Sequence, residues 1–229
     1  MTSIALICEG VSEVKMLTYI INRYLGDDVV VNAYQPSLKV THGQKKQDDD
    51  GGWLQVLNHC KDEIFNDIMA INDYIVVQID TDACIQVDYG VDIYDENHQK
   101  VTDDVLYDRV CTRIQRDLSE EVRNKYSDKI LFAICIDETE CWLLPLYYEN
   151  DAKKRCATNN CIYILNQKLQ KEGFGIPQKD KNSPEAINVY QRVLKRMKRK
   201  DIPAIAQCNY GFQKFVEQMD TIKVIITVE

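Results

Sequence analysis

Acidic residues follow three apolar runs of this 229-residue sequence, and their spacing suits metal-assisted chemistry. The central run, Ile75–Cys84 (IVVQIDTDAC), ends in Asp80 and Asp82. Residues two apart in a strand point to the same side, so both carboxylates can face one spot. A nearly continuous apolar run is typical of a parallel strand covered on both faces, where an unpaired carboxylate is costly to bury. The pattern therefore predicts a positive group beside these acids.

The first acidic segment is Ser3–Leu17 (SIALICEGVSEVKML). Ile4–Cys8 is an apolar stretch that predicts a strand, and Glu9 follows it directly. Ser12 can cap a helix that begins near Glu13. This segment therefore brings two carboxylates to a strand-to-helix junction.

The third acidic segment is Ile130–Leu144 (ILFAICIDETECWLL), again an apolar strand pattern. Its acids are Asp137, Glu138 and Glu140. The crevice outside the carboxyl ends of parallel strands is where open α/β sheets bind ligands. Converging carboxylates repel one another unless a cation neutralises them, and hard oxygen ligands favour Mg²⁺ or Mn²⁺. Such ions assist phosphoryl transfer, so we expect phosphodiester chemistry.

The elements that must position these acids alternate between strand and helix. Helices are expected over Glu13–Leu25, Trp53–Ile71 and Asp103–Lys125, with a further strand over Asp28–Ala33. The alternation predicts an α/β fold with a mostly parallel central sheet flanked by helices. We expect a catalytic core over residues 1–150, with an insertion at about 85–128, and a helical C-terminal extension over residues 151–229. The last residues, IKVIITVE, suggest an additional edge strand.

The overall charge is acidic, with a formal net charge of −8 at pH 7. This charge disfavours a surface that coats nucleic acid all over, although a local basic groove is compatible with it. No apolar stretch reaches the length of a membrane span, and the N-terminus lacks the features of a signal peptide. We therefore expect a cytoplasmic protein that makes no membrane contact.

Basic residues are concentrated near the C-terminus, in the stretch RVLKRMKRK. They are Arg192, Lys195, Arg196, Lys198, Arg199 and Lys200. A helix starting near Pro184, with Ser183 as its cap, is expected to continue through them. Its basic face either grips a nucleic-acid backbone or balances neighbouring acids in solvent. Lys45 and Lys46, in the polar stretch 35–52, lie either in a solvated loop or in a phosphate-contacting flap.

The nine cysteines do not suggest a disulfide framework, because the number is odd. Cys8, Cys84 and Cys135 lie in or beside apolar strand patterns, which is typical of free buried thiols in a reducing compartment. No cysteine pair has the CxxC spacing of a zinc site, and only three histidines are available.

The glutamate of EGVSE after the first strand and the later DTD resemble the Toprim fold of topoisomerases, primases and OLD-type nucleases. The EGxSE form together with ETECWLLP is more similar to the OLD nuclease and RloB-like branch, which is associated with bacterial anti-phage defence. Glu140, Trp142, Leu143 and Leu144 correspond to the Glu-x-Trp-Leu-Leu segment of that branch. About 25 residues in the three motifs carry the resemblance.

The resemblance implies roles for individual residues. Glu9 would be the catalytic acid or base, with Mg²⁺ or Mn²⁺ as the cofactor. The metal ligands it implies are Glu13, Asp80, Asp82 and one or both of Glu138 and Glu140, with Asp137 as a substitute. These residues include no ATPase domain like that of full OLD proteins, which suggests a separate partner ATPase. Cys84 stands where a DxDxD pattern has its third aspartate, so the number of metal ions stays open.

The function we expect is a magnesium-dependent nuclease acting on DNA or RNA. A non-cleaving module that binds a partner ATPase or nucleic acid is the alternative. A third interpretation takes Asp80-Thr81-Asp82 as the nucleophile motif of a haloacid-dehalogenase-type phosphatase, although that fold usually places the motif on its first strand. The sequence leaves the polymer, the cleavage mode and the oligomeric state open.

Overall fold

A four-stranded, all-parallel sheet forms the centre of the computed structural model, which describes residues 1–41, 44–47, 51–177 and 180–228. Its strands run in the order β2-β1-β5-β6. Their bounds are β1 Thr2–Ile7, β2 Val29–Gln35, β5 Tyr74–Asp80 and β6 Ile130–Cys135. A separate antiparallel hairpin pairs β3 (Leu38–Thr41) with β4 (Gln44–Gln47). The predicted α/β class with a parallel sheet is confirmed.

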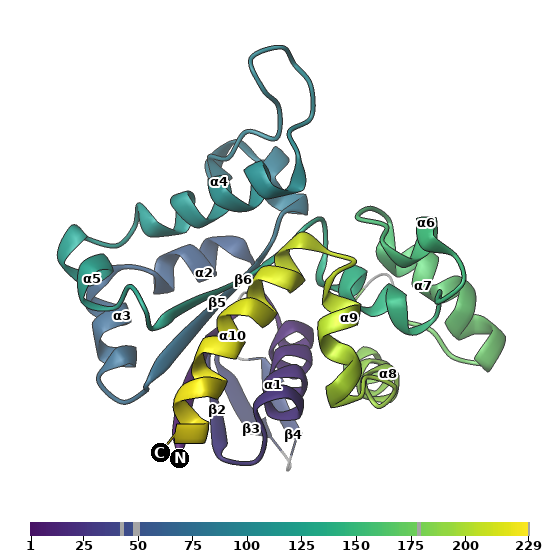
Figure 1. Ribbon diagram of the computed structural model, residues 1–229, viewed down its shortest axis with the longest axis horizontal. Helices are drawn as coiled ribbons and strands as arrows, with labels where there is room; N and C mark the ends of the chain where they lie inside the picture. Colours follow the sequence, from purple (N-terminus) through teal and green to yellow (C-terminus); the bar gives the residue numbers. More distant parts are fainter. Residues whose placement is uncertain (42–43, 48–50, 178–179, 229) are drawn as a thin grey trace.

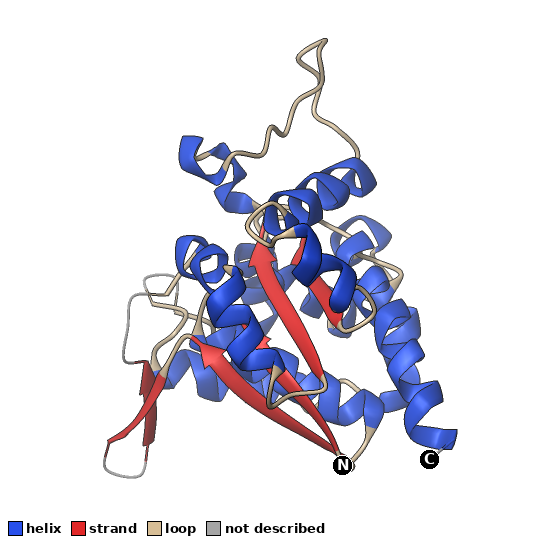
Figure 2. Cartoon of the chain, turned by 90° about the vertical axis from the view of Figure 1, so that its left-hand side faces the viewer, coloured by secondary structure: helices blue, strands red, loops and turns tan. Residues whose placement is uncertain are grey.

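Helices cover both faces of this sheet (Figures 1 and 2). Side chains that alternate along β1 enter two different cores: Ile4 and Leu6 one, Ala5 and Ile7 the other. On the first face α1 Val11–Leu25 and α10 Tyr210–Val228 pack against the strands. Three further helices extend the same core beyond them: α7 Cys161–Leu169, α8 Pro184–Leu194 and α9 Ile202–Ala206. The helices of the second face are α2 Trp53–His59, α3 Asp62–Met69, α4 Asp103–Gln115 and α5 Glu120–Lys125. Covering on both faces explains why the strands read as apolar runs.

Short 3₁₀ turns and one further helix complete the described chain. They are η1 Asp82–Ile85, η2 Val87–Tyr89, η3 Thr139–Leu146, α6 Ala152–Arg155, η4 Gln170–Glu172 and η5 Arg199–Asp201. The turns η1 and η3 come shortly after β5 and β6, and they contain Asp82 and Glu140 of the acidic motifs.

Two helices that the sequence predicts as continuous are each divided. The first breaks between α2 and α3, where Lys61 adopts an extended backbone. The second breaks between α4 and α5, where the Ser119 hydroxyl accepts a hydrogen bond from the Val122 N–H and caps α5. Because a side-chain cap satisfies free N–H groups at a new helix start, Ser119 favours the break.

The predicted C-terminal edge strand is wrong, because α10 continues to Val228. The helix occupies the edge that a strand would need. The Gln218 side chain accepts from the Phe132 N–H (2.8 Å) and donates to its carbonyl (3.1 Å), so it pairs with the outer strand β6. Gly211 allows this close approach, since a Cβ there would lie 1.8 Å from the Ile134 carbonyl oxygen.

The Trp-Leu-Leu part of the third motif belongs to the core. Trp142 is fully buried and stacks on Phe212 at a ring separation of 4.4 Å. Its indole N–H donates to Asn209 Oδ1 (3.2 Å). These residues therefore fix η3 against α10. In the part of the chain that the structure describes, no helix has both the length and the apolarity to cross a membrane.

Candidate active site

The three acidic segments meet at the carboxyl ends of adjacent strands. β5 lies between β1 and β6 in the sheet. Glu9 Oε1 accepts a hydrogen bond from the Asp80 N–H at 2.6 Å, and the Asp82 N–H donates to the Asp137 carbonyl at 3.0 Å. We use the term acidic cluster for Glu9, Glu13, Asp80, Asp82, Asp137, Glu138 and Glu140.

Lys181 is the positive group within the acidic cluster. Its Nζ lies 3.0 Å from Glu13 Oε1 and 3.2 Å from Asp80 Oδ2. The Lys181 side chain is 30% exposed, whereas those of Glu13 and Asp80 are at most 2% exposed. The ammonium therefore neutralises two buried carboxylates, while its side chain remains partly exposed to solvent.

The loop before α8 places Lys181 by docking on the start of α1. Asn182 Oδ1 accepts from the Ser12 N–H at 3.0 Å. Gly10 makes room for this contact, since a Cβ there would lie 2.6 Å from both Asn182 Oδ1 and Glu13 Oε2. The helix begins at Val11, one residue before the predicted cap, so Ser12 lies inside it and makes no cap hydrogen bond. Its hydroxyl instead lies 2.8 Å from Glu13 Oε2.

Asp80 is held through its other oxygen as well. Oδ1 accepts from Thr139 Oγ1 (2.7 Å) and Gln78 Nε2 (2.8 Å). Gln78 Oε1 in turn accepts from the Glu9 N–H at 3.0 Å. Gln78 thus connects the first two acidic segments, and its polar side chain in a buried strand is explained by these bonds.

Asp82 and Asp137 lie at the edge of the acidic cluster. Strand β5 ends at Asp80, so Asp82 opens η1 and is more exposed; the predicted strand geometry for this pair is wrong. Asp137 has a positive φ of 67°, which is uncommon outside glycine. The Thr81 hydroxyl accepts from the Asp137 N–H at 2.7 Å and fixes this turn.

Glu138 and Glu140 face different surroundings. Glu138 Oε1 accepts from the Ile162 N–H at 2.7 Å, at the start of α7. Glu140 is fully buried and accepts a short hydrogen bond from the Tyr190 hydroxyl through Oε1. Its Oε2 has no hydrogen-bond partner among the described residues. Glu140 therefore has one buried carboxylate oxygen to which no described residue donates a hydrogen bond.

Burial and mutual repulsion shift the proton affinities of these groups. Burial, then the Asp80 carboxylate, raises the pKa of Glu9. Burial also raises the pKa of Asp80 despite the nearby Lys181 ammonium, and it raises that of Glu140 to about 8. Burial acts in the same direction on Glu13, but Lys181 and the Ser12 hydroxyl outweigh it and lower the pKa overall. Acids with opposite shifts in one site are a pattern found in active centres.

By ligand type the acidic cluster suits a hard divalent cation, but among the described residues no three of its carboxylates lie within 4.8 Å of one another. Its donor atoms are carboxylate oxygens, the ligands preferred by Mg²⁺ and Mn²⁺. The unpartnered Oε2 of Glu140 is an independent indication, because a buried carboxylate oxygen without a partner is costly. Lys181 supplies part of the positive charge that the cluster requires.

The predicted basic helix does not extend beside the acidic cluster. α8 ends at Leu194, and the buried Met197 interrupts the basic segment, by which we mean Arg192–Lys200. The Met197 carbonyl accepts from Arg23 Nε (3.4 Å) in the last turn of α1, whereas Glu13 lies in the first turn. Ten residues of helix place these two ends about 15 Å apart.

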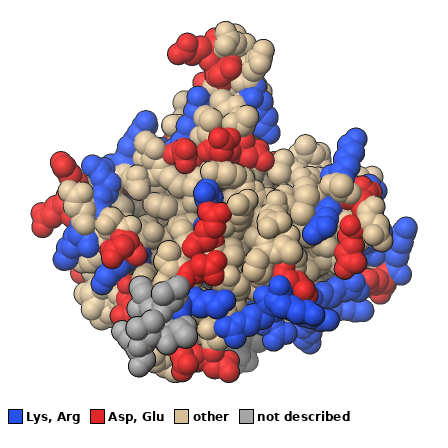
Figure 3. All heavy atoms as spheres, viewed as in Figure 1, with Lys and Arg blue, Asp and Glu red and all other residues tan. Residues whose placement is uncertain are grey.

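The six basic side chains have different environments. Arg192 lies over the Phe174 ring (3.8 Å to its centroid) and Arg196 over that of Tyr147 (4.3 Å). Arg196 also forms an ion pair with Glu172 at 2.6 Å. The exposed remainder are Lys195, Lys198, Arg199 and Lys200. Figure 3 shows a band of Lys and Arg side chains in this part of the surface, over α8.

The two residues Gln35 and Gly52, which flank the hairpin of Lys45 and Lys46 in the sequence, are hydrogen-bonded to the chain at Cys8 and Glu9. The Cys8 N–H donates to the Gln35 carbonyl (2.8 Å), and the Gly52 N–H donates to the Glu9 carbonyl (2.7 Å). Both lysines belong to β4, and their side chains lie outside the described part of the structure.

A disulfide joins Cys141 to Cys161, although the odd number of cysteines did not suggest a disulfide framework. Cys8, Cys84 and Cys135 are free, as predicted. Disulfides are uncommon in reducing compartments, so this bond does not support the cytoplasmic expectation.

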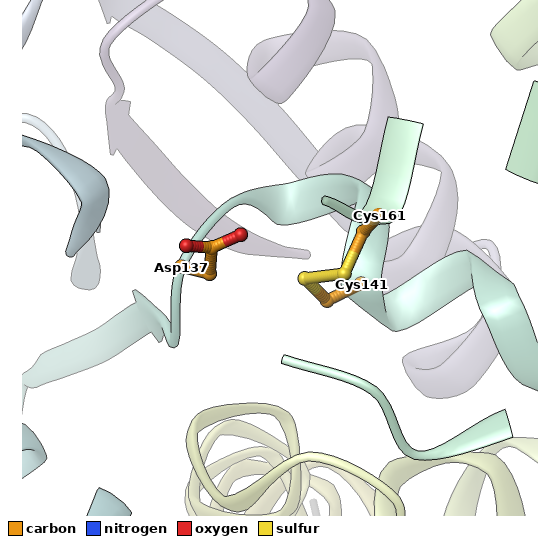
Figure 4. A group of neighbouring side chains, drawn as sticks. All are labelled: Asp137, Cys141 and Cys161. Carbon is orange, nitrogen blue, oxygen red and sulfur yellow. A yellow bond between two sulfur atoms is a disulfide. The ribbon is translucent and has the colours of Figure 1, made fainter. Parts of the chain in front are cut away.

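The same two cysteines lie beside the acidic cluster. Potential ligand atoms of Asp137, Cys141 and Cys161 lie within 4.8 Å of one another (Figure 4). Because the sulfurs are bonded to each other, they are not available as the thiolates that a metal binds.

Four residues that contact the acids were not predicted from the sequence. They are Gln78, Thr139, Lys181 and Tyr190. Gln78 could have been identified from the sequence, since it is a polar residue inside an apolar strand. Lys181 could not, because it lies in a polar loop 101 positions from Asp80 and even farther along the chain from Glu13.

Comparison of the chain with protein-family models, with curated proteins and with solved structures found no match. The proposed function therefore rests on the residues of the site and on the sequence motifs.

Proposed function

We propose that this protein is a divalent-metal-dependent nuclease that hydrolyses phosphodiester bonds of DNA or RNA. The observation that carries the proposal is that Asp80 contacts Glu9 through its N–H and is linked to Glu13 through Lys181. The resemblance of EGVSE and DTD to Toprim motifs supports the same function, and we propose a Toprim-like fold on that basis. It also leads us to propose a role in anti-phage defence.

The metal would be held by Glu13, Asp80 and Asp82, with Glu138 and Glu140 available for a second ion. When bound, divalent ions supply positive charge to the oxygens of the reacting phosphate. The chain's own charged group is Lys181, whose ammonium can donate hydrogen bonds to a phosphate at the opening of the site.

Glu9 is suited to moving a proton. The Asp80 N–H holds Oε1 at 2.6 Å and so fixes the orientation of the carboxyl group. Its raised pKa, due first to burial and then to Asp80, keeps a proton available nearer neutral pH than for an exposed glutamate. Glu9 can therefore act on the attacking water or on the leaving oxygen.

The test is a cleavage assay with plasmid DNA, single-stranded DNA and total tRNA, each in Mg²⁺, Mn²⁺ or chelator. We expect at least one polymer to be degraded with metal, and we expect Glu9→Gln to lose the activity. Glu185→Gln, at an exposed position on α8, is the matched control. Cleavage that persists in chelator, or that is unchanged in Glu9→Gln, would contradict the proposal.

A non-cleaving binding module is the second candidate function, and Lys181 favours it. Its ammonium neutralises Glu13 and Asp80 directly, so these acids can remain buried together without a metal. This module would bind nucleic acid or a partner ATPase. Binding that is equal in metal and in chelator, with no turnover of any polymer, would select this function.

A further inference from the structure

The turn that follows Asp82 exposes two aliphatic side chains to solvent. Ile85 is 77% exposed and Val87 is 93% exposed. Ile85 closes the same 3₁₀ turn that Asp82 opens, and three residues of this geometry span only about 6 Å. The aliphatic pair is therefore next to the acidic cluster.

Hydrogen bonds from two aromatic side chains hold this turn in place. The Tyr89 hydroxyl donates to the Asp80 carbonyl (3.4 Å), and the Trp53 indole N–H donates to Gln86 Oε1 (3.2 Å). Tyr89 is fully buried, and its ring packs against Trp53 at a centroid separation of 5.3 Å. Buried contacts of this kind hold the backbone in place, so Ile85 and Val87 are presented to solvent by a supported turn.

A cleft of about 570 Å³ lies beside the two aliphatic residues and has Tyr94 on its lining. Asp92 is the one charged residue among those that line it. Tyr94 is 48% exposed, and its carbonyl is held by Arg109 of α4 at 2.9 Å. The loop from which it comes projects beyond α4 in Figure 1. An exposed aromatic ring and two aliphatic side chains thus border an apolar cleft.

We propose that Ile85, Val87 and Tyr94 bind an unpaired nucleobase of the substrate, adjacent to the phosphate that is cleaved. The inference deepens the proposed nuclease function and rests on it. Aliphatic side chains can wedge between bases, and aromatic rings stack on their faces. The position of the turn favours the substrate over a protein partner, because Ile85 and Asp82 belong to the same 3₁₀ turn and a base bound here lies close to the acidic cluster.

The proposal predicts a substrate with an unpaired nucleotide, either a single strand or a frayed end. A base in an intact duplex is already stacked and presents no free face. The lining of the cleft contains no lysine or arginine, so it suits a base and not a phosphate.

The experiment measures binding of single-stranded and duplex oligonucleotides that contain the fluorescent base 2-aminopurine. The parent is Glu9→Gln in Mg²⁺, which prevents turnover. We expect the fluorescence to change on binding of the single strand. In the same background, Ile85→Ser with Val87→Ser, or Tyr94→Ala, should abolish the change and weaken single-strand binding about tenfold (about 1.4 kcal/mol). Duplex binding should stay constant.

The matched control is Ile71→Ser, which alters an aliphatic side chain that is 70% exposed near the opposite end of β5. Unchanged fluorescence and affinity in the double variant would overturn the proposal while leaving metal-dependent cleavage by the wild type intact. Absence of both binding and cleavage in the wild type would overturn the nuclease function as well. Self-association of the wild type that the double variant loses, measured by sedimentation, would identify the surface as a protein interface instead.

Discussion

The acidic cluster and the basic segment are both concentrations of charge, but the fold treats them in opposite ways. The acids come from three separate parts of the sequence and meet because β1, β5 and β6 are neighbours in one parallel sheet. The basic residues are adjacent in sequence, yet Met197 enters the core between them and their side chains remain mostly exposed. In this fold, charges at strand ends thus converge in space, whereas a run of like charges along the chain does not.

The acidic cluster and the basic segment should differ most in how strongly a substitution changes the free energy of unfolding. Lys181→Met leaves Glu13 and Asp80 buried without their cation, and loss of one partner of a buried ion pair typically costs about 3 kcal/mol or more. We expect a decrease of roughly 3 kcal/mol in the free energy of unfolding, measured with urea in chelator. Lys200→Met, at an exposed position, should change it by less than about 0.5 kcal/mol. Equal effects of the two substitutions would remove the distinction between the regions.

Glu140 should make the stability contribution of the acidic cluster depend on pH. Its pKa is about 8 in the folded protein against an ordinary value of 4.5. The folded state therefore binds more protons between these values, and stability should fall as the pH rises from about 4.5 to 8.

Glu140→Gln removes this titration and keeps a group that can accept from Tyr190. We expect it to be more stable than the wild type at pH 8 by roughly 4 kcal/mol, with little difference at pH 4.5. Urea unfolding in chelator at both pH values measures the effect, with Glu185→Gln as the control. A variant with the wild-type pH slope would show that Glu140 is not the group responsible.

Substitution of Gly10 should reduce cleavage activity much more than it reduces stability. An added Cβ would meet side-chain atoms of Glu13 and Asn182, which can shift, so Gly10→Ala should cost only about 1 kcal/mol of stability. The same shift displaces a proposed metal ligand, and cleavage should fall by about tenfold or more. Parallel unfolding and cleavage measurements test this. Unchanged cleavage would mean that the position of Glu13 is not critical.

The basic segment should show the smallest effect. Lys195→Gln with Lys198→Gln removes two exposed charges at a distance from the acids. We expect the free energy of unfolding to stay within about 0.5 kcal/mol of the wild type. If this surface contacts phosphates, the slope of log affinity against log salt should decrease by up to about two units for duplex DNA. An unaltered salt slope would contradict the predicted contact.

The sheet and the three acidic segments could be predicted from the sequence because their signals are local. Apolar runs of strand length end at Glu9, Asp80 and Asp137, and alternation with helices determines that the strands are parallel. The helix breaks and the course of the last helix depend on contacts between distant residues. Gln218, for example, pairs with Phe132, 86 positions earlier in the chain.

The acids could be identified from the sequence, but the groups that hold them could not. Lys181 reaches Asp80 across 101 positions, and Tyr190 reaches Glu140 across 50. Neither contact leaves a periodic signal. The direction of Asp82 could not be predicted either. The strand ends at Asp80 and the chain turns, so the alternation expected for a strand does not reach Asp82.

A calorimetric titration of Mn²⁺ into the wild type, Asp80→Asn and Asp88→Asn would test the central claim most directly. Asp80 is buried within the acidic cluster, whereas Asp88 is an exposed acid of the adjacent η2 turn. We predict saturable binding to the wild type and to Asp88→Asn, and its loss in Asp80→Asn. Equal binding by all three proteins, or none by the wild type, would contradict a divalent-cation site at the carboxyl ends of the strands.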